Sequence, residues 1–300
     1  MKKRILITLA VACLILIASI TGYLVKTEPW VDHEGYEITQ FGTSTGAQCM
    51  FYTIRDDEGR LVVIDGGYTA DETNVANIIK KFGGHVDTWI LTHPHPDHIG
   101  AFNAIYPKLK DYGITVDHIY ATDTNHDRYV ETAKDYDAVD TFLTFEKLTK
   151  GDKKLKFLHE NDEFDLLPGL HMKVLHAWDK NVDKTENNLC NNGSLMFKLT
   201  GKKQSMLFCA DTQYQMEEYI VPGHKDELKC DYVQCGHHGN WGMSMDFYKL
   251  TGAKRAFFDG PNYLYDDDKG SYDGHKTADF FRGNAYISRL AAAPTVIKLY

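Results

Sequence analysis

The chain has 300 residues, of which 43% are hydrophobic and 25% are charged. These values are ordinary for a globular protein, and the length allows one large domain or two small ones. The formal net charge of -9 argues against stable binding to nucleic acid, because neutralising many phosphates requires Lys and Arg clustered on one face. A small anionic substrate is compatible with this charge.

The N-terminal segment differs in composition from the rest of the chain. The basic segment Lys2–Arg4 precedes an uncharged apolar run, Ile5–Val25, that is long enough to cross a bilayer as a helix. No clean small-x-small cleavage site precedes Lys26, which favours an uncleaved anchor over a cleaved signal peptide. We therefore expect residues 1–26 to be a signal anchor or signal peptide. Residues 27–300 would then form one domain outside the cell membrane, or a secreted one if the segment is cleaved.

Short apolar segments alternate with longer amphipathic ones after the N-terminal run. Apolar residues in continuous or alternating runs predict strands, and apolar residues three or four positions apart predict helices. The predicted elements, in chain order, are strands over residues 49–54 and 60–64, a helix over 71–82, a strand over 88–91, a helix over 129–147, a hairpin of strands 194–199 and 205–210, and a strand over 231–235. This order is typical of an α/β layered sandwich.

Three histidines and one aspartate fall within six residues directly after the strand predicted over 88–91. The segment reads His93-Pro-His95-Pro-Asp97-His98, and its two prolines stiffen the loop. Imidazole nitrogen and carboxylate oxygen are ligands that suit Zn²⁺ and related transition metals. His93 and His95 point the same way in an extended segment, whereas Asp97 and His98 can turn toward a second ion. Two adjacent metal sites are expected.

This motif resembles the His-x-His-x-Asp-His signature of the metallo-β-lactamase superfamily. The turn that begins at Asp65 is similar to the family's Asp-Gly-Gly turn, and Ala210–Thr212 is similar to its Gly-Asp motif. The resemblance extends over roughly residues 35–260. It implies a four-layer αββα sandwich, here preceded by the N-terminal transmembrane or signal helix. It also implies that Asp211 bridges the two metals and that Asp65 orients a ligand histidine.

A histidine pair in the segment Cys235–Asn240 resembles the Pro-His-His-Gly-Ser segment of the competence-protein (ComEC-like) branch of this superfamily. The resemblance implies that His237 completes the second metal site as the sixth ligand, after the motif residues and Asp211. His238 is then a group on the substrate side. The opposite assignment of the two histidines is left open, because ring orientation cannot be read from a sequence.

One feature of the family is missing from this sequence. Many members supply a third histidine to the first metal about 25 positions before the bridging aspartate, and none lies there in this chain. His176 is the nearest histidine upstream, and four asparagines fill the stretch from Asn187 to Asn192. We therefore expect an open first site that is held by His93, His95 and Asp211.

The cysteines do not indicate a disulfide framework. Five of them follow the N-terminal run, an odd number without the paired spacing of a zinc ribbon: Cys49, Cys190, Cys209, Cys230 and Cys235. Buried free thiols are expected, with a Cys230–Cys235 pair as the alternative.

These features predict a metal-dependent hydrolase with two divalent ions, zinc being favoured and Mn²⁺ or Fe²⁺ being alternatives. A water bridging the ions would become acidic and provide the attacking hydroxide. We expect Asp97 to hold this nucleophile and His238 to donate a proton to the leaving group.

The favoured substrate is a small or envelope-derived anionic phosphoester or phosphodiester. A lactone or other acyl ester is the alternative substrate, and a membrane-tethered binding module with a vestigial metal site is the alternative function. Trp241, Tyr263 and His275 follow the last motif and are candidates for lining a substrate pocket.

Overall fold

The computed structural model describes residues 35–266, 270–289 and 294–300. The predicted signal anchor or signal peptide, residues 1–26, lies outside the described residues. Within the described part, none of the helices combines the length and apolar character that crossing a membrane requires. The location of the protein therefore stays a prediction.

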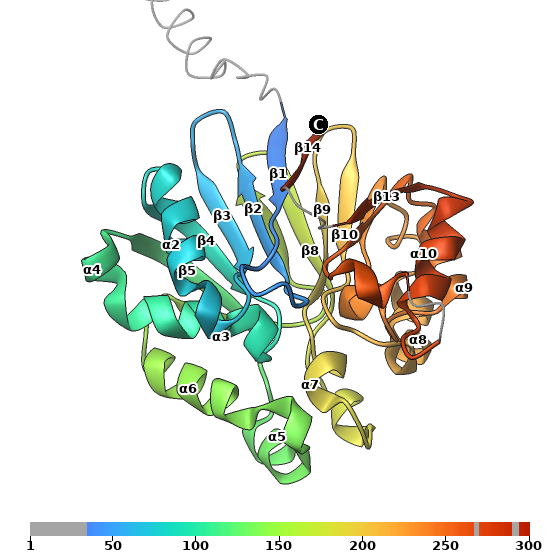
Figure 1. Cartoon of the computed structure of the whole chain (residues 1–300), viewed down its shortest axis with the longest axis horizontal. Coiled ribbons are helices and arrows are strands. Elements are labelled where there is room, and N and C mark those ends of the chain that lie inside the picture. The colour runs from blue at the N-terminus through green and yellow to red at the C-terminus, as the bar shows by residue number, and fades with distance from the viewer. Residues whose placement is uncertain (1–34, 267–269, 290–293) are drawn as a thin grey trace, which may run out of the picture. The chain divides into compact units, whose positions relative to one another are not determined.

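Two mixed seven-stranded sheets form the centre of the unit Gly35–Tyr300 (Figure 1). The first has the order β14-β1-β2-β3-β4-β5-β6, with β1 (Tyr36–Gln40), β2 (Phe51–Arg55), β3 (Leu61–Asp65), β4 (His85–Leu91), β5 (Thr115–Thr122), β6 (Leu155–Leu158) and β14 (Thr295–Leu299). The second has the order β13-β12-β11-β10-β9-β8-β7, with β7 (Glu163–Leu167), β8 (Leu170–His176), β9 (Met196–Thr200), β10 (Ser205–Phe208), β11 (Tyr232–Gln234), β12 (Arg255–Phe258) and β13 (Tyr286–Arg289). Strands β3 to β6 run parallel to one another, and so do β10 to β13.

The strands at the centre of each sheet are buried on both faces. On β3, Val62 and Ile64 share one apolar cluster with Phe208 of the other sheet, whereas Val63 shares a second cluster with Ile79 of a covering helix. Successive side chains of a strand point to opposite faces, so a continuous apolar run is what a strand between two layers requires. One cluster therefore joins sheet to sheet, and the other joins the sheets to the helices.

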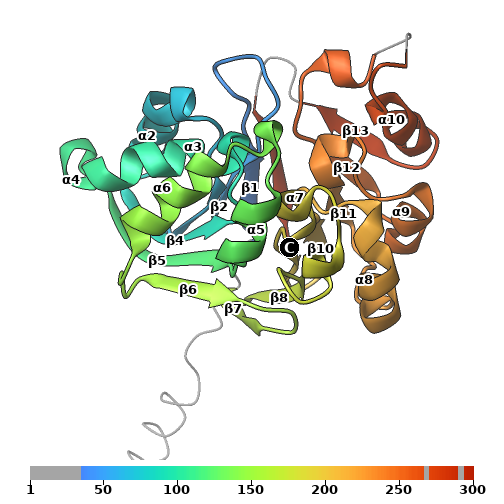
Figure 2. The same cartoon turned by 90° about the horizontal axis from the view of Figure 1, so that it is seen from below.

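The helices cover the outer faces of both sheets. Their bounds are α2 (Glu72–Lys81), α3 (Pro96–Ile105), α4 (Leu109–Tyr112), α5 (His126–Thr132), α6 (Val139–Thr149), α7 (Leu189–Asn192), α8 (Glu217–His224), α9 (Met245–Thr251) and α10 (Gly274–Arg282). Figures 1 and 2 show α2, α3, α4 and α6 beside the first sheet and α8, α9 and α10 beside the second. The order of layers agrees with the expected four-layer α/β sandwich.

The single helix predicted over residues 129–147 is wrong, because the structure has two helices there. Helix α5 ends at Thr132 and α6 begins at Val139. The Asp137 carboxylate accepts the backbone N–H of Lys134 at 2.5 Å, and Ala138 takes a left-handed conformation with φ 48°. This turn breaks the helix and buries the side chain of Asp137. The other predicted strands, the first helix and the β9–β10 hairpin are confirmed.

The five cysteines that follow the N-terminal segment are all free thiols, as expected. Four of them are buried, and Cys230 is partly exposed. The alternative Cys230–Cys235 pair is therefore not formed.

A buried aspartate links the two sheets next to the inter-sheet core. Asp259 follows β12 of the second sheet, and its Oδ1 accepts the Tyr52 hydroxyl at 2.5 Å and the Gln40 side-chain amide at 2.6 Å from the first sheet. Burial raises the pKa of Asp259 to about 6. The folded protein therefore holds this proton to a higher pH than the unfolded chain does.

We predict that Asp259→Asn removes a pH-dependent part of the stability. Between pH 3.8 and about 6 the aspartate is ionised in the unfolded chain and protonated in the folded protein. Folding then takes up a proton, so the free energy of unfolding falls as the pH rises through this window, by about 1.4 kcal/mol per unit of pKa difference. Asparagine accepts the same two hydrogen bonds and has no proton to lose. Relative to wild type, the variant should gain stability as the pH rises to about 6 and then level off.

Thermal unfolding of both proteins across this pH range measures the effect. A difference between the two proteins that does not change with pH would contradict the prediction.

Candidate metal centre

The residues predicted to bind metal lie at the carboxyl ends of parallel strands from both sheets. Strand β3 ends at Asp65, and β4 leads directly into the histidine motif. Strand β10 precedes Asp211, and β11 precedes the histidine pair. Loops at these ends place side chains from rigid sheets close together, so the expected concentration of polar groups at one edge is observed.

The motif is a loop that turns into a helix. His95 is the N-cap of α3 with extended backbone angles, and Pro96 occupies the first helical position. Proline suits this position because its fixed φ fits the helix and no N–H is needed there. Asp97 then lies in the first turn, where the helix dipole favours a negative charge.

The turn formed by Asp65, Gly66 and Gly67 also packs against α3. Gly67 donates to the His98 carbonyl at 3.2 Å, and its own carbonyl accepts the N–H of Ala101 at 2.9 Å. A Cβ on Gly100 would lie 2.5 Å from the backbone nitrogen of Thr69, so only glycine permits this approach. The two sequence motifs are therefore joined through their backbones.

Asp65 contacts His98, the last histidine of the motif. Its Oδ2 lies 2.7 Å from His98 Nδ1 and also accepts the Thr92 hydroxyl at 2.6 Å, while its Oδ1 accepts the Thr92 N–H at 2.8 Å. All three side chains are buried. A carboxylate at Nδ1 requires the ring proton there, so the lone pair of His98 lies on Nε2 and faces the other candidate ligands.

Asp211 lies at the centre of the candidate ligands. Its Oδ1 is 3.3 Å from His98 Nε2, and its Oδ2 is 3.3 Å from His238 Nε2 and 3.8 Å from His93 Nε2. The preceding residue, Ala210, has φ 46°, the left-handed conformation that explains why a glycine is usual there. This central place is what a bridging carboxylate requires.

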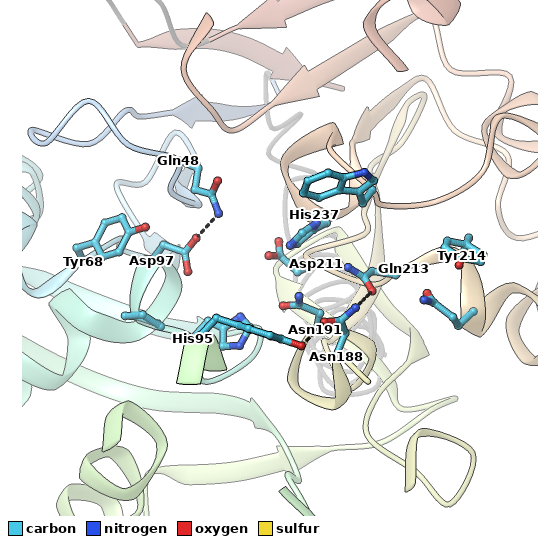
Figure 3. A pocket seen from close by; sticks show the side chains of 14 residues that line it. Gln48, Tyr68, His95, Asp97, Asn188, Asn191, Asp211, Gln213, Tyr214 and His237 are labelled. Carbon is cyan, nitrogen blue, oxygen red and sulfur yellow. Dashed lines mark hydrogen bonds between the residues drawn. The ribbon is translucent and has the colours of Figure 1, made fainter. Parts of the chain in front are cut away.

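The histidine pair has the opposite arrangement to the one expected. His238 Nε2 lies 3.2 Å from Asp97 Oδ2 as well as close to Asp211, whereas His237 lines the adjoining pocket (Figure 3). His237 and His238 have φ 49° and 57°, so two successive left-handed residues turn the second ring inward. His237 Nδ1 donates to the Asn240 carbonyl at 2.5 Å instead. The expectation that His237 is the sixth ligand and His238 the substrate-side group is corrected by exchanging the two.

The donor set fits two metal ions. Ligand atoms of His93, His98 and Asp211 lie within 4.8 Å of one another, and so do those of Asp97, His98 and His238. Buried polar atoms without hydrogen-bond partners are rare in native proteins because they are costly. Seven such atoms among the described residues belong to this cluster. One is Nδ1 of His238, and the six near the other candidate ligands are Nε2 of His93, His95, His98 and His238 and Oδ1 of Asp137 and Asp211. Cations would give these atoms the partners that the protein does not supply.

Protons occupy the cluster when no metal does. Burial opposes the charged form of His98, but Asp211 and Asp65 raise its pKa well above the ordinary value. Burial likewise opposes the charged form of His238, but Asp211 and Asp97 raise its pKa to about 10. The carboxylates are therefore neutralised by imidazolium groups, and metal binding has to release these protons.

Two residues that the sequence analysis did not assign lie beside the first predicted site. Asp137 Oδ1 is 3.5 Å from His95 Nε2, and the thiol of Cys190 belongs to a buried group with His93 and His95. Asp137 was not considered because it fell within the helix predicted over residues 129–147. Cys190 was expected only to be a buried thiol. The missing third histidine was the one sequence signal that another residue was needed here.

An open cavity of about 520 Å³ adjoins the cluster (Figure 3). It is lined by Gln48, Tyr68, His95, Pro96, Asp97, Tyr136, Asn188, Asn191, Asp211, Gln213, Tyr214, Gln215, His237 and Trp241. Apart from Pro96, these lining residues are amides, aromatic groups and members of the metal cluster, and they include no Lys or Arg. Of the three residues predicted to line a pocket, Trp241 does so, whereas Tyr263 and His275 do not.

We predict that Asp65→Asn weakens metal binding without unfolding the protein. Asparagine tolerates the left-handed backbone at this position, where φ is 52°. Its amide would donate to His98 Nδ1, however, and move the ring proton to Nε2, where the metal should bind. Affinity for one ion should fall by roughly 10 to 100-fold. Competition with a chromophoric chelator measures this, and Asp246→Asn is the control, because Asp246 is exposed and belongs to none of the metal-binding groups found among the described residues. Equal affinities in the three proteins would refute the orienting role.

A model of one protein family matches part of the chain. Residues 44–177 match the family model described as the metallo-beta-lactamase superfamily, a range that includes the motif from His93 to His98. The search of curated proteins found no match.

Solved structures share the fold at low sequence identity. The metallo-beta-lactamase fold protein YhfI from Bacillus subtilis is 14% identical with a TM-score of 0.53, over 88% of this chain and 100% of its own. Zn²⁺-bound PqqB from Methylobacterium extorquens is 10% identical with a TM-score of 0.54, over 87% and 99%. CmlA, a diiron β-hydroxylase from Streptomyces venezuelae, is 12% identical with a TM-score of 0.55, and the match covers 89% of this chain but 54% of CmlA. The family model thus matches residues 44–177, and the solved structures show that the fold is shared.

Proposed function

We propose that this protein is a metal-dependent hydrolase with a binuclear centre. The observation that supports this best is the convergence of buried, unpartnered imidazole and carboxylate atoms beside an open polar cavity. A binding module needs no such pair of adjacent sites next to a cavity of substrate size. Zinc is the favoured metal, because nitrogen and oxygen donors in this combination suit it.

The chain's residues divide into two sets of ligands. His93 and His95 would hold the first ion, Asp97, His98 and His238 the second, and Asp211 both. Bound there, the two ions would supply an acidic water as nucleophile and would stabilise the negative charge that develops on the substrate.

His237 is the group that we now assign to the substrate side. It lines the cavity, and its Nδ1 donates to the Asn240 carbonyl, so Nε2 is the nitrogen left for a substrate. Burial lowers the pKa of His237 below its ordinary value. The ring is therefore neutral at pH 7, and it accepts a hydrogen bond or a proton more readily than it donates one. The proton donation that was expected of His238 is accordingly withdrawn.

A phosphodiester is the favoured substrate. With no Lys or Arg among the described lining residues, the ions would supply the positive charge, and a singly charged diester suits this better than a doubly charged monoester. The side-chain amides of Gln48, Asn191 and Gln213 can donate to phosphate or sugar oxygens. Tyr68 and Trp241 offer flat apolar surfaces for the groups on either side of the phosphorus.

A lactone or other acyl ester is the second candidate, since the uncharged lining also suits a neutral carbonyl substrate. The same nucleophile would attack the carbonyl carbon. If the segment of residues 1–26 is an anchor, either reaction would take place outside the membrane on small or envelope-derived substrates.

The central test is metal content and turnover of the full chain, for wild type and Asp211→Asn. Wild type should bind about two ions and hydrolyse bis-p-nitrophenyl phosphate, and the variant should lose at least one ion and lower kcat/KM by roughly a hundredfold or more. A parallel panel of a phosphomonoester, a lactone and an aryl ester separates the substrate classes. Absence of bound metal in wild type would exclude the proposal, and two ions without turnover on any substrate would favour the binding module.

The histidine pair provides a matched comparison within one turn of chain. His238→Ala should lower metal content, because it removes a ligand from the second site. His237→Ala should retain both ions and change KM or kcat, because it alters the cavity alone. Metal analysis of the two purified variants measures this. Metal loss in His237→Ala with full content in His238→Ala would restore the original assignment.

A further inference from the structure

Cys190 lies beside the two histidines of the first proposed metal site. Its sulfur and one ring nitrogen each of His93 and His95 all lie within 4.8 Å of one another, and all three side chains are buried. Nε2 of both histidines lacks a hydrogen-bond partner in the described part of the chain. Thiolate sulfur and imidazole nitrogen are the donors that zinc and other borderline metals bind best.

The segment that contains Cys190 is fixed to the motif loop. Cys190 lies in α7, and just beyond it the Asn192 carbonyl contacts His176 Nε2 at 2.6 Å. Leu195 donates its N–H to the Thr92 carbonyl at 2.9 Å, next to His93. His176, the nearest histidine upstream of Asp211, is thus a buried residue that supports this segment. These bonds hold the thiol at a defined place relative to the histidines.

We infer that Cys190 is the third protein ligand of the first metal ion, bound as a thiolate. The inference rests on the proposed binuclear function. Cys190 is 21 residues before Asp211, in the stretch where the family resemblance led us to expect a histidine. The metal–sulfur bond replaces the S–H bond, and the proton passes to solvent. The first ion would then have four protein donors, His93, His95, Cys190 and Asp211, one more than the sequence led us to expect, and a fifth position would remain for the water.

Asp137 is the competing residue. Its Oδ1 is buried, lacks a partner and lies 3.5 Å from His95 Nε2. It does not, however, belong to the group that contains both His93 and His95. Cys190 is therefore the better candidate to bind an ion that both histidines hold, whereas Asp137 contacts His95 alone of the two.

A thiolate ligand narrows the choice of metal and substrate. Sulfur favours Zn²⁺, Co²⁺ and iron over Mn²⁺, which prefers oxygen donors. It also adds a negative charge that an imidazole does not, so the centre becomes less attractive to a doubly charged phosphomonoester. Both consequences agree with the preference for a phosphodiester or a neutral ester.

Cobalt substitution of the full chain tests the inference by a spectrum that does not depend on activity. Co²⁺ bound to a thiolate has a sulfur-to-metal charge-transfer band in the near ultraviolet, and Co²⁺ bound to nitrogen and oxygen alone does not. We expect the band in wild type, its loss in Cys190→Ser and in Cys190→His, and its retention in Cys230→Ser. Cys230 is a suitable control because it belongs to none of the metal-binding groups found among the described residues.

Metal affinity provides the second readout. Removing a residue that only orients a ligand already lowers metal affinity by roughly 10 to 100-fold. Cys190→Ser should therefore lower the affinity for one of the two ions by at least this factor. Cys190→His should recover the affinity without the band, which separates ligation from a purely structural role. Two tightly bound ions with no charge-transfer band in wild type, or a band that persists in Cys190→Ser, would overturn the inference and leave the binuclear proposal intact. Absence of bound metal would overturn both.

Discussion

The structure depends on holding several buried polar atoms at one place without hydrogen-bond partners from the protein. Nε2 of His98 and of His238 each lie 3.3 Å from an oxygen of Asp211 without forming a hydrogen bond, and Nε2 of His93 lies 3.8 Å from the same carboxylate. Leaving polar groups unpaired in a protein interior costs on the order of 1–3 kcal/mol each. The sheets, the glycine turn and the Asp65–His98 hydrogen bond stabilise this arrangement, so the folded chain is arranged for cations before they bind.

Left-handed residues at strand ends make the convergence possible. Asp65, Ala210, His237 and His238 all have positive φ, and each follows or ends a strand that leads to the centre. Such conformations cost free energy for residues other than glycine and persist only where the surroundings enforce them. Here these conformations turn the side chains at the strand ends toward the edge of the cavity. Local strain at four positions thus produces a single cluster from two sheets.

The sequence predicted those parts of the site that depend on local spacing. The motif from His93 to His98 follows from its spacing after a predicted strand, whereas the role of Asp65 and the four-layer sandwich were implied by the family resemblance. The choice between His237 and His238 did not follow, because it depends on backbone angles that neighbouring histidines do not reveal. Asp137 depends on a helix break that hydrophobic periodicity does not show. Cys190 depends on contacts across the fold, and its residue type alone is more typical of a core.

Charge connects the metal centre with the choice of substrate. Two dications would bring four positive charges, and the carboxylates of Asp97 and Asp211 together with a bridging hydroxide would remove three of them, leaving an excess that suits a single phosphate charge. A thiolate at Cys190 and the carboxylate of Asp137 beside His95 reduce this excess further. Because the cavity has no cationic side chain among its described lining residues, nothing else restores it. Because a thiolate ligand lowers the positive charge of the centre, the centre should bind doubly charged substrates less well than diesters or neutral esters.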